Sequence, residues 1–268
     1  MIDLTKQISR PIQNATTKST LTGRVSRYDG LLLECDGFPV SVGSVCSVKT
    51  ATGTVVLGEV IGYSDGLNKL VLYESGAAVQ AGAQVSLVDE GVFVDVGDAY
   101  LGRVVDALGD PLDEAPAPVG NDSVPLNGTF LNPLARKLIP GALDVGVRAV
   151  NGLLTIGSGQ RIGIIAGSGV GKSVLLSMIT RSAEADVIVV GLIGERGREL
   201  ASFTKEITSS HSKHKVVIVA VPADRSALLR LQGAKRATSI AEYFRDQGKN
   251  VLLILDSLTR VAHAQREI

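Results

Sequence analysis

The stretch Ala166-Gly167-Ser168-Gly169-Val170-Gly171-Lys172-Ser173 constrains the fold more than any other part of the sequence. It lies between an apolar run at 161–166, predicted to be a strand, and an amphipathic segment at 172–184, predicted to be a helix. Glycines in such a loop let successive main-chain N–H groups point inward, where they and the positive end of the helix dipole attract phosphate oxygens. A glycine-rich turn that only packs the helix against the strand is the alternative interpretation.

The spacing within this loop assigns roles to individual residues. The pattern G-x-x-x-x-G-K-S/T begins here with Ala166 in place of the usual glycine, and its small side chain should be tolerated. Lys172 is predicted to reach the β- and γ-phosphates of ATP, and the Ser173 hydroxyl to ligate Mg²⁺. The predicted nucleotide-binding residues are Ala166, Gly167, Ser168, Gly169, Val170, Gly171, Lys172, Ser173 and Val174.

After the loop, apolar runs alternate with helical segments. The runs at 187–193, 216–221 and 251–255 are typical of buried strands, and residues 226–247 are predicted to be mostly helical. This alternation predicts an α/β fold, with a mostly parallel sheet covered by helices on both faces.

Two carboxylates follow predicted strands and would therefore lie at the same edge of the sheet. Asp256 ends the run at 251–255 and is predicted to hold Mg²⁺. Its alternative role is the N-cap of a helix that begins at Ser257. Glu195 follows the run at 187–193 and is placed to polarise the attacking water, while Arg196 would touch the γ-phosphate or orient Glu195. A solvated charge cluster is the alternative for Glu195 and Arg196.

The chain is predicted to have three parts. Residues 1–18 are polar and aperiodic and form a tail, and residues 19–90 contain short strand-like runs separated by turns, which is typical of a small β-barrel. Residues 91–268 form the ATP-binding domain. The runs in the barrel region are at 31–35, 40–48, 55–63 and 67–73.

Charge and composition bear on the class of partner and on the location of the chain. The 27 basic and 27 acidic residues give a net charge of zero, and residues 19–90 hold 4 basic against 8 acidic side chains. A groove for nucleic acid needs the opposite balance, so a nucleic-acid motor with an oligonucleotide-binding barrel is disfavoured. No secretory signal and no apolar run of about 20 residues is found, which predicts a cytosolic chain.

The loop, the segment Gly194-Glu195-Arg196-Gly197-Arg198-Glu199 and the segment Leu255-Asp256-Ser257-Leu258-Thr259-Arg260 together closely resemble the type III export ATPases. These are the flagellum-specific ATPase and its injectisome relatives, which are kin of the catalytic subunit of rotary ATP synthases. The resemblance extends from about residue 100 to residue 268, and more loosely through the barrel. Supporting stretches lie at 101–106, 109–113, 146–154 and 241–249, and the ending Ala264-Gln265-Arg266-Glu267-Ile268 favours the flagellar branch.

The resemblance implies a RecA-like P-loop core after a β-barrel, a homohexamer, and Glu195 as the catalytic carboxylate. It also implies that the N-terminal tail contacts a stator or regulator protein. Export substrates and chaperones would meet a C-terminal domain, and the assembly would contact the membrane export gate from the cytoplasm. Asn151 departs from the usual Asp, with no expected effect on catalysis.

The resemblance also implies that the chain is C-terminally truncated, because family members continue well beyond the point that corresponds to Ile268. The function expected of the intact protein is ATP hydrolysis coupled to type III export, and turnover by this chain alone is doubtful. Two alternatives stay open: a rotary ATP synthase catalytic-type subunit, and a truncated nucleotide-binding module without turnover.

Overall fold

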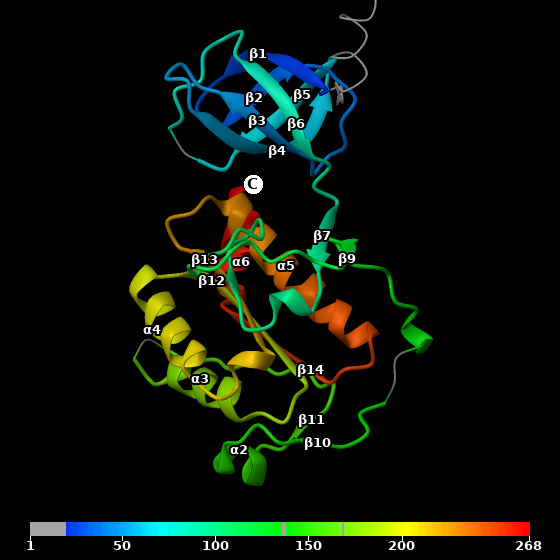
Figure 1. The fold of residues 1–268 in the computed structure, drawn as a ribbon, viewed down its shortest axis with the longest axis vertical. Helices are drawn as coiled ribbons and strands as arrows, with labels where there is room; N and C mark the ends of the chain where they lie inside the picture. The colour runs from blue at the N-terminus through cyan, green and yellow to red at the C-terminus, as the bar shows by residue number, and fades with distance from the viewer. Residues whose placement is uncertain (1–19, 75, 136–137, 168) are drawn as a thin grey trace, which may run out of the picture. The chain divides into compact units, whose positions relative to one another are not determined.

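A computed structural model describes residues 20–268, apart from residues 75, 136–137 and 168. The predicted tail at 1–18 lies outside the described residues. The chain divides into two compact units: the first holds the described residues up to Leu72 together with Gly76–Glu90, and the second runs for the most part from Gly91 to Ile268 (Figure 1). Each unit is described separately below.

The first unit is a closed antiparallel barrel, which confirms the predicted architecture. Alternate side chains of its strands are buried, as expected when one face of each strand faces a core. Cys35 and Cys46 are buried in that core, and burial raises the pKa of the two thiols to about 12 and about 11. In the order β1-β2-β5-β4-β3-β6 the strands are β1 (Thr22–Tyr28), β2 (Leu32–Asp36), β5 (Leu67–Leu72), β4 (Val55–Ser64), β3 (Val45–Lys49) and β6 (Gln84–Asp89).

One predicted strand of the barrel is shorter than expected. The apolar run at 40–48 predicted a single strand, but the structure begins β3 only at Val45. Gly43 adopts a left-handed backbone conformation with φ 96°, which is incompatible with an extended strand. The residues before β3 therefore form a turn, a feature that apolar content alone does not reveal.

The second unit contains a four-stranded parallel sheet in the order β14-β12-β13-β8 (Figure 1). This confirms the predicted parallel α/β architecture. Two small antiparallel pairs, β7 with β9 and β10 with β11, accompany it. The strands of the parallel sheet are β8 (Val104–Val105), β12 (Val187–Glu195), β13 (Val216–Pro222) and β14 (Val251–Asp256). The strands of the antiparallel pairs are β7 (Phe93–Val96), β9 (Asp122–Pro125), β10 (Ala142–Leu143) and β11 (Ile156–Gly157). The helices are α2 (Arg148–Leu153), α3 (Lys172–Ser182), α4 (Gly197–Thr208), α5 (Ala227–Asp246) and α6 (Leu258–Glu267), with the 3₁₀ turns η1 (Asp98–Tyr100), η2 (Pro133–Ala135) and η3 (Lys213–Lys215).

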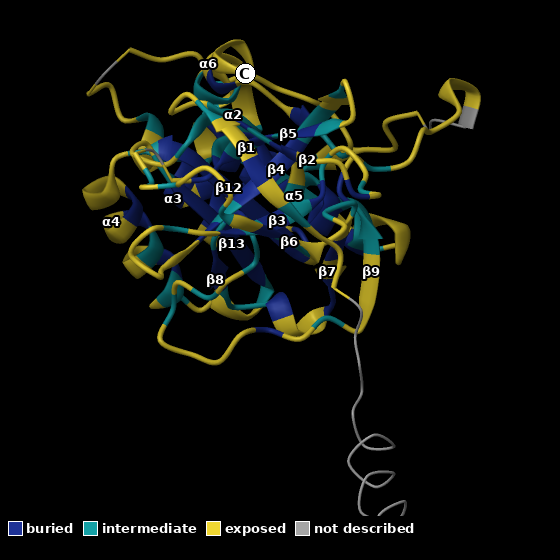
Figure 2. Cartoon of the chain, turned by 90° about the horizontal axis from the view of Figure 1, so that it is seen from above, coloured by how far each residue is buried: buried dark blue, intermediate teal, exposed yellow. Residues whose placement is uncertain are grey.

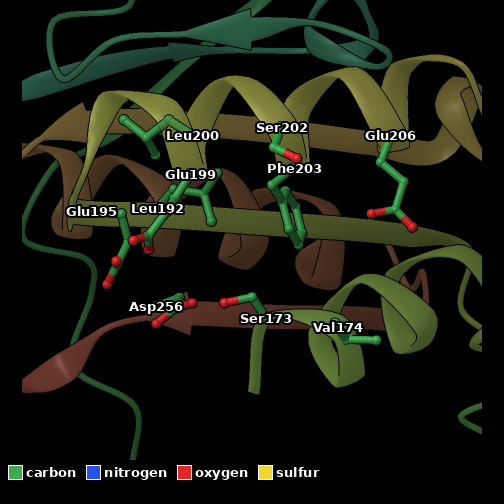
Figure 3. A pocket seen from close by; sticks show the side chains of 10 residues that line it. All are labelled: Ser173, Val174, Leu192, Glu195, Glu199, Leu200, Ser202, Phe203, Glu206 and Asp256. Carbon is green, nitrogen blue, oxygen red and sulfur yellow. The ribbon is translucent and has the colours of Figure 1, made fainter. Parts of the chain in front are cut away.

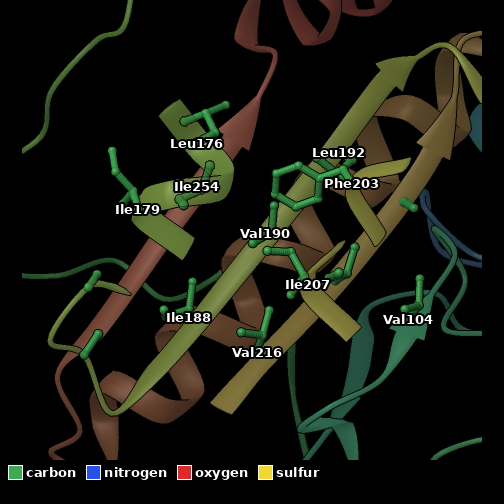
Figure 4. Packing of buried hydrophobic residues seen from close by; sticks show 14 of the residues in the cluster. Val104, Leu176, Ile179, Ile188, Val190, Leu192, Phe203, Ile207, Val216 and Ile254 are labelled. Carbon is green, nitrogen blue, oxygen red and sulfur yellow. The ribbon is translucent and has the colours of Figure 1, made fainter. Parts of the chain in front are cut away.

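Helices cover both faces of this sheet, also as predicted. Ile188, Val190 and Leu192 point to one face, where they pack with side chains of α3 and α4 (Figure 4). The alternating residues Val187 and Val189 point to the other face, against α5. Strands β12 and β13 are buried (Figure 2). Because both of their faces are covered, their sequences are continuous apolar runs rather than alternating ones.

Helix α5 confirms the helix predicted at 226–247. The Ser226 hydroxyl accepts a hydrogen bond from the N–H of Leu229 at 3.4 Å, which supplies a partner to one of the free donors at the start of the helix. None of the helices in the described part of the chain is both long and apolar enough to span a lipid bilayer.

The prediction of a strand at 161–166 was wrong. Residues 161–167 form neither a strand nor a helix, and Ile165 is 100% exposed. A strand exists only through main-chain hydrogen bonds to a neighbour, and β14, the edge strand of the sheet, does not pair with this segment. The apolar pattern was correctly recognised, but a pattern cannot supply the neighbouring strand.

Gly233 of α5 gives a test of how closely this helix packs on the sheet. A Cβ at this position would lie 2.4 Å from Cγ2 of Val221 on β13. Helix propensity alone would make Gly233→Ala stabilising by up to about 1 kcal/mol. The clash should outweigh this gain because valine has a stiff side chain, so we expect a net loss of about 1–2 kcal/mol in the free energy of unfolding, measured by urea denaturation.

Gly152→Ala in α2 is the matched control, since a Cβ there meets no atom within 4 Å. We expect it to be neutral or slightly stabilising. A stabilising effect of Gly233→Ala would show that α5 does not pack this closely on β13.

Candidate active site

The glycine-rich loop leads directly into α3. Gly169 and Gly171 have φ angles of 78° and 97°, which favour glycine, and a Cβ at either position would meet no atom within 4 Å. Gly171 occupies the N-cap, where no side chain caps the helix. The first N–H groups of α3 therefore lack a capping side chain, and such groups attract anions. Of the predicted loop residues, Ser168 lies outside the described part.

Lys172, the first residue of α3, contacts the Asp256 carboxylate at the end of β14. Asp256 is only 5% exposed, so it needs a compensating charge. This pair joins residues 84 positions apart, and it brings together two of the predicted site residues. Asp256 does not act as a side-chain N-cap of α6, where Ser257 occupies the N-cap position without a capping hydrogen bond from its side chain.

Glu195 ends the neighbouring strand β12. The pairing of β12 with β13 shifts between Ile193 and Glu195, and Gly194 between them has φ 74°. This irregularity turns the Glu195 side chain at the edge of the sheet, where Arg260 Nε lies 3.3 Å from its Oε1. The Glu195 side chain is 13% exposed. The alternative of a solvated charge cluster therefore does not describe Glu195.

The surroundings of Glu195 raise the pKa of its carboxyl above the ordinary value. Burial is the largest cause and the negative charge of Asp256 the second, while Arg260 and Lys172 act in the opposite direction. A carboxylate that holds its proton more tightly is a stronger base, which suits a group that orients or deprotonates water.

Arg196 lies away from Glu195. Its side chain is 75% exposed, and its guanidinium pairs with Glu199 at 3.4 Å in the first turn of α4. The sequence offered two roles for Arg196, contact with the γ-phosphate or orientation of Glu195, but the arginine that pairs with Glu195 in the structure is Arg260. Arg260 belongs to the segment 255–260, but nothing in the order of residues indicated that it would reach Glu195.

A cleft of about 210 Å³ is lined by Glu195 and Asp256 together. Figure 3 shows side chains of α4 along one side of it, and Ser173, Val174 and Asp256 on the opposite side. The Ser173 hydroxyl and the Asp256 carboxylate are oxygen donors, the type that Mg²⁺ prefers. The cleft is lined by Ser173, Val174, Leu192, Glu195, Glu199, Leu200, Ser202, Phe203, Glu206 and Asp256.

A parallel sheet with carboxylates at its strand ends, beside a glycine-rich loop that opens a helix with Gly-Lys-Ser, defines a nucleotide-binding domain of the P-loop class. Residues 146–268 match the family model described as ATP synthase alpha/beta family, nucleotide-binding domain. This part of the chain is similar to the nucleotide-binding domain of that family.

Over most of its length the chain is similar to flagellum-specific ATP synthases and type III secretion ATPases. It is 48% identical to the flagellum-specific ATP synthase of Pseudomonas aeruginosa, over 98% of this chain and 58% of that protein. It is 42% identical to the type 3 secretion system ATPase of Xanthomonas euvesicatoria, over 92% of this chain and 56% of that protein. The chain thus spans somewhat more than half the length of these relatives.

Solved structures show the same relation. The assembled ATPase EscN in complex with its central stalk EscO, from the type III secretion system of enteropathogenic E. coli, matches with a TM-score of 0.83 and 41% identity. The match covers 91% of this chain and 60% of that one.

The raised pKa of Glu195 predicts how stability depends on pH. Between the ordinary value of 4.5 and the raised pKa of the folded protein, Glu195 is protonated in a larger fraction of folded molecules than of unfolded ones. The folded state then binds more protons, so this group lowers stability as the pH rises toward its folded pKa. Glu195→Gln removes the effect. We expect the free energy of unfolding of this variant, relative to the parent, to increase from pH 4.5 toward neutral.

Urea denaturation over this pH range measures the difference, and Glu184→Gln, which removes an exposed carboxylate, is the control. A relative stability of Glu195→Gln that stays constant or decreases with pH would contradict the direction of the shift.

Proposed function

We propose that this site hydrolyses ATP and that, in the whole protein, hydrolysis drives type III protein export, with flagellar assembly favoured over injectisome secretion. The observation that carries the proposal is that Glu195 and Asp256 line one cleft, with Lys172 of the glycine-rich loop in contact with Asp256. The names of the relatives support the coupling to export. Because the chain spans only part of those relatives, the activity of the whole protein is inferred from them.

The proposed roles follow from the placement of each side chain. Main-chain N–H groups of the loop and the start of α3 bind the phosphates, and Lys172 exchanges Asp256 for phosphate oxygens. Glu195 orients a water molecule for in-line attack on the γ-phosphorus and accepts its proton. Arg196 is sufficiently exposed to reach toward the γ-phosphate if it leaves Glu199, as the sequence suggested.

A magnesium ion fits the oxygen donors at this site. Ser173 and Asp256 both line the cleft, and they are the residues that we propose hold the metal. The ion would supply positive charge that neutralises the phosphates. Asp256 becomes available for this role when Lys172 turns to the nucleotide.

The proposed assembly is a cytoplasmic homohexamer at the membrane export gate. The solved relative is an assembled ATPase in complex with a central stalk, which supports an oligomer and a protein partner. The stator or regulator contact through residues 1–18, and the contacts with export substrates and chaperones, stay predictions from the resemblance.

Steady-state ATP turnover tests the proposed chemistry. We expect Glu195→Gln to bind Mg-ATP with an affinity close to that of the parent and to lose at least about 100-fold in kcat, because it loses the general base. We expect Lys172→Ala to lose nucleotide binding. The measurements are phosphate release and nucleotide affinity by calorimetry.

Lys205→Ala, an exposed lysine on α4, is the control and should behave as the parent does. If the parent binds Mg-ATP without turnover, the chain is a nucleotide-binding module and the proposed hydrolysis is rejected for it. If the folded parent does not bind Mg-ATP, the assignment of the loop is wrong.

Magnesium binding is tested separately through Ser173. We expect the affinity of the parent for ATP to be higher with Mg²⁺ than with EDTA, and Ser173→Ala to lose most of that gain while keeping its affinity for metal-free ATP. Isothermal titration calorimetry measures the ATP affinity of the parent and of Ser173→Ala, each in a buffer with Mg²⁺ and in a buffer with EDTA. An equal magnesium effect in the parent and the variant would remove Ser173 from the metal site.

A further inference from the structure

The cation that faces Glu195 comes from the segment that also carries Asp256. Arg260 lies in the first turn of α6, four residues after Asp256, and its Nε is 3.3 Å from Glu195 Oε1. Its main-chain N–H donates to the Ser257 carbonyl at 3.1 Å, which fixes the turn from which the side chain projects. One short segment thus brings a carboxylate and a cation to the end of the sheet.

The aliphatic part of the Arg260 side chain is held by packing, in addition to the ion pair that its guanidinium makes. A Cβ built on Gly194 would lie 2.6 Å from the Cδ of Arg260, so the aliphatic part of the arginine occupies the space above this glycine. The arginine side chain is 37% exposed, while the glutamate is 13% exposed. Packing against Gly194 aims the guanidinium at the residue that follows, which is Glu195.

The other cations near the site have different partners. Lys172 contacts Asp256, and Arg196 pairs with Glu199. Among the described residues, Arg260 is therefore the cation with an ion pair to Glu195. Without it, a mostly buried carboxylate would face the negative charge of Asp256, and Lys172, which contacts Asp256, would be the remaining described cation that acts on it. The Glu195 side chain would then be driven toward solvent.

We propose that Arg260 is the positioning residue of Glu195: its guanidinium holds the carboxylate at the cleft in the orientation from which it acts on water. This inference rests on the hydrolysis proposed above and adds to it a role that acts through Glu195. The planar guanidinium fixes the direction of a carboxylate better than an ammonium group can. Turnover should therefore depend on Arg260 more strongly than nucleotide affinity does.

Kinetics separate positioning from binding. We expect Arg260→Gln to lower kcat by about 10- to 100-fold, because a small misplacement of a reacting group has effects of this size. The affinity for Mg-ATP should stay within about threefold of the parent, because Glu195 is not needed for binding. Arg260→Lys, which keeps the charge but lacks the planar group, should recover part of the rate.

Arg266→Gln removes an exposed arginine from the same helix and is the matched control, with parental kcat expected. A kcat of Arg260→Gln within about twofold of the parent overturns the proposal. So does a loss of affinity as large as the loss of rate, since Arg260 would then act on the nucleotide directly.

A double-mutant cycle tests the pair in the absence of turnover. Arg260→Gln should lower the Tm of the parent by a few degrees, about 2–4 °C, because it leaves Glu195 unpaired. In the Glu195→Gln background the same Arg260→Gln substitution leaves no unpaired carboxylate, so we expect it to lower the Tm by less than half as much. If Arg260→Gln lowers the Tm equally in the parent and in the Glu195→Gln variant, the inference is overturned, whether or not the parent hydrolyses ATP.

The two proposals can fail separately. A parent that binds Mg-ATP but does not turn it over rejects the proposed hydrolysis, and with it the effect of Arg260 on rate. The Tm cycle then still decides whether Arg260 holds Glu195.

Discussion

The site depends on the parallel pairing of β12 with β14 on one side and β13 on the other. Leu192 of β12 lies opposite Asp256 of β14, and Glu195 lies opposite Pro222 of β13, so β12 extends three residues beyond the level of Asp256. Because parallel strands end at the same edge, carboxylates that are far apart in the sequence meet there. The buried apolar strands fix this register, since a slip would change which side chains face α3 and which face α5.

Charge compensation explains why two carboxylates can share this edge. Each is mostly buried, and each has its own cation: Asp256 contacts Lys172, and Glu195 pairs with Arg260. The two cations come from the starts of α3 and α6, the helices that follow the glycine-rich loop and β14. The starts of α3 and α6 therefore supply the charges that make the burial of these two carboxylates tolerable.

The sequence allowed much of this to be predicted. Long apolar runs identified β12, β13 and β14, and the Gly-Lys-Ser motif located the start of α3, because each of these signals is local. The strand at 161–166 could not be judged locally, since it depends on a partner strand. The choice of Arg260 over Arg196 likewise depends on the packing of α6 against Gly194, and on the preference of Arg196 for Glu199 in its own helix.

The ion pairs of the site also affect how a nucleotide could bind. Phosphate oxygens would compete with Asp256 for Lys172, so binding has to break a contact that helps to compensate a buried charge. A metal ion arriving with the nucleotide would replace the lost cation at Asp256. Nucleotide and metal are therefore expected to bind cooperatively, because either one alone leaves a charge at the edge of the sheet without a partner.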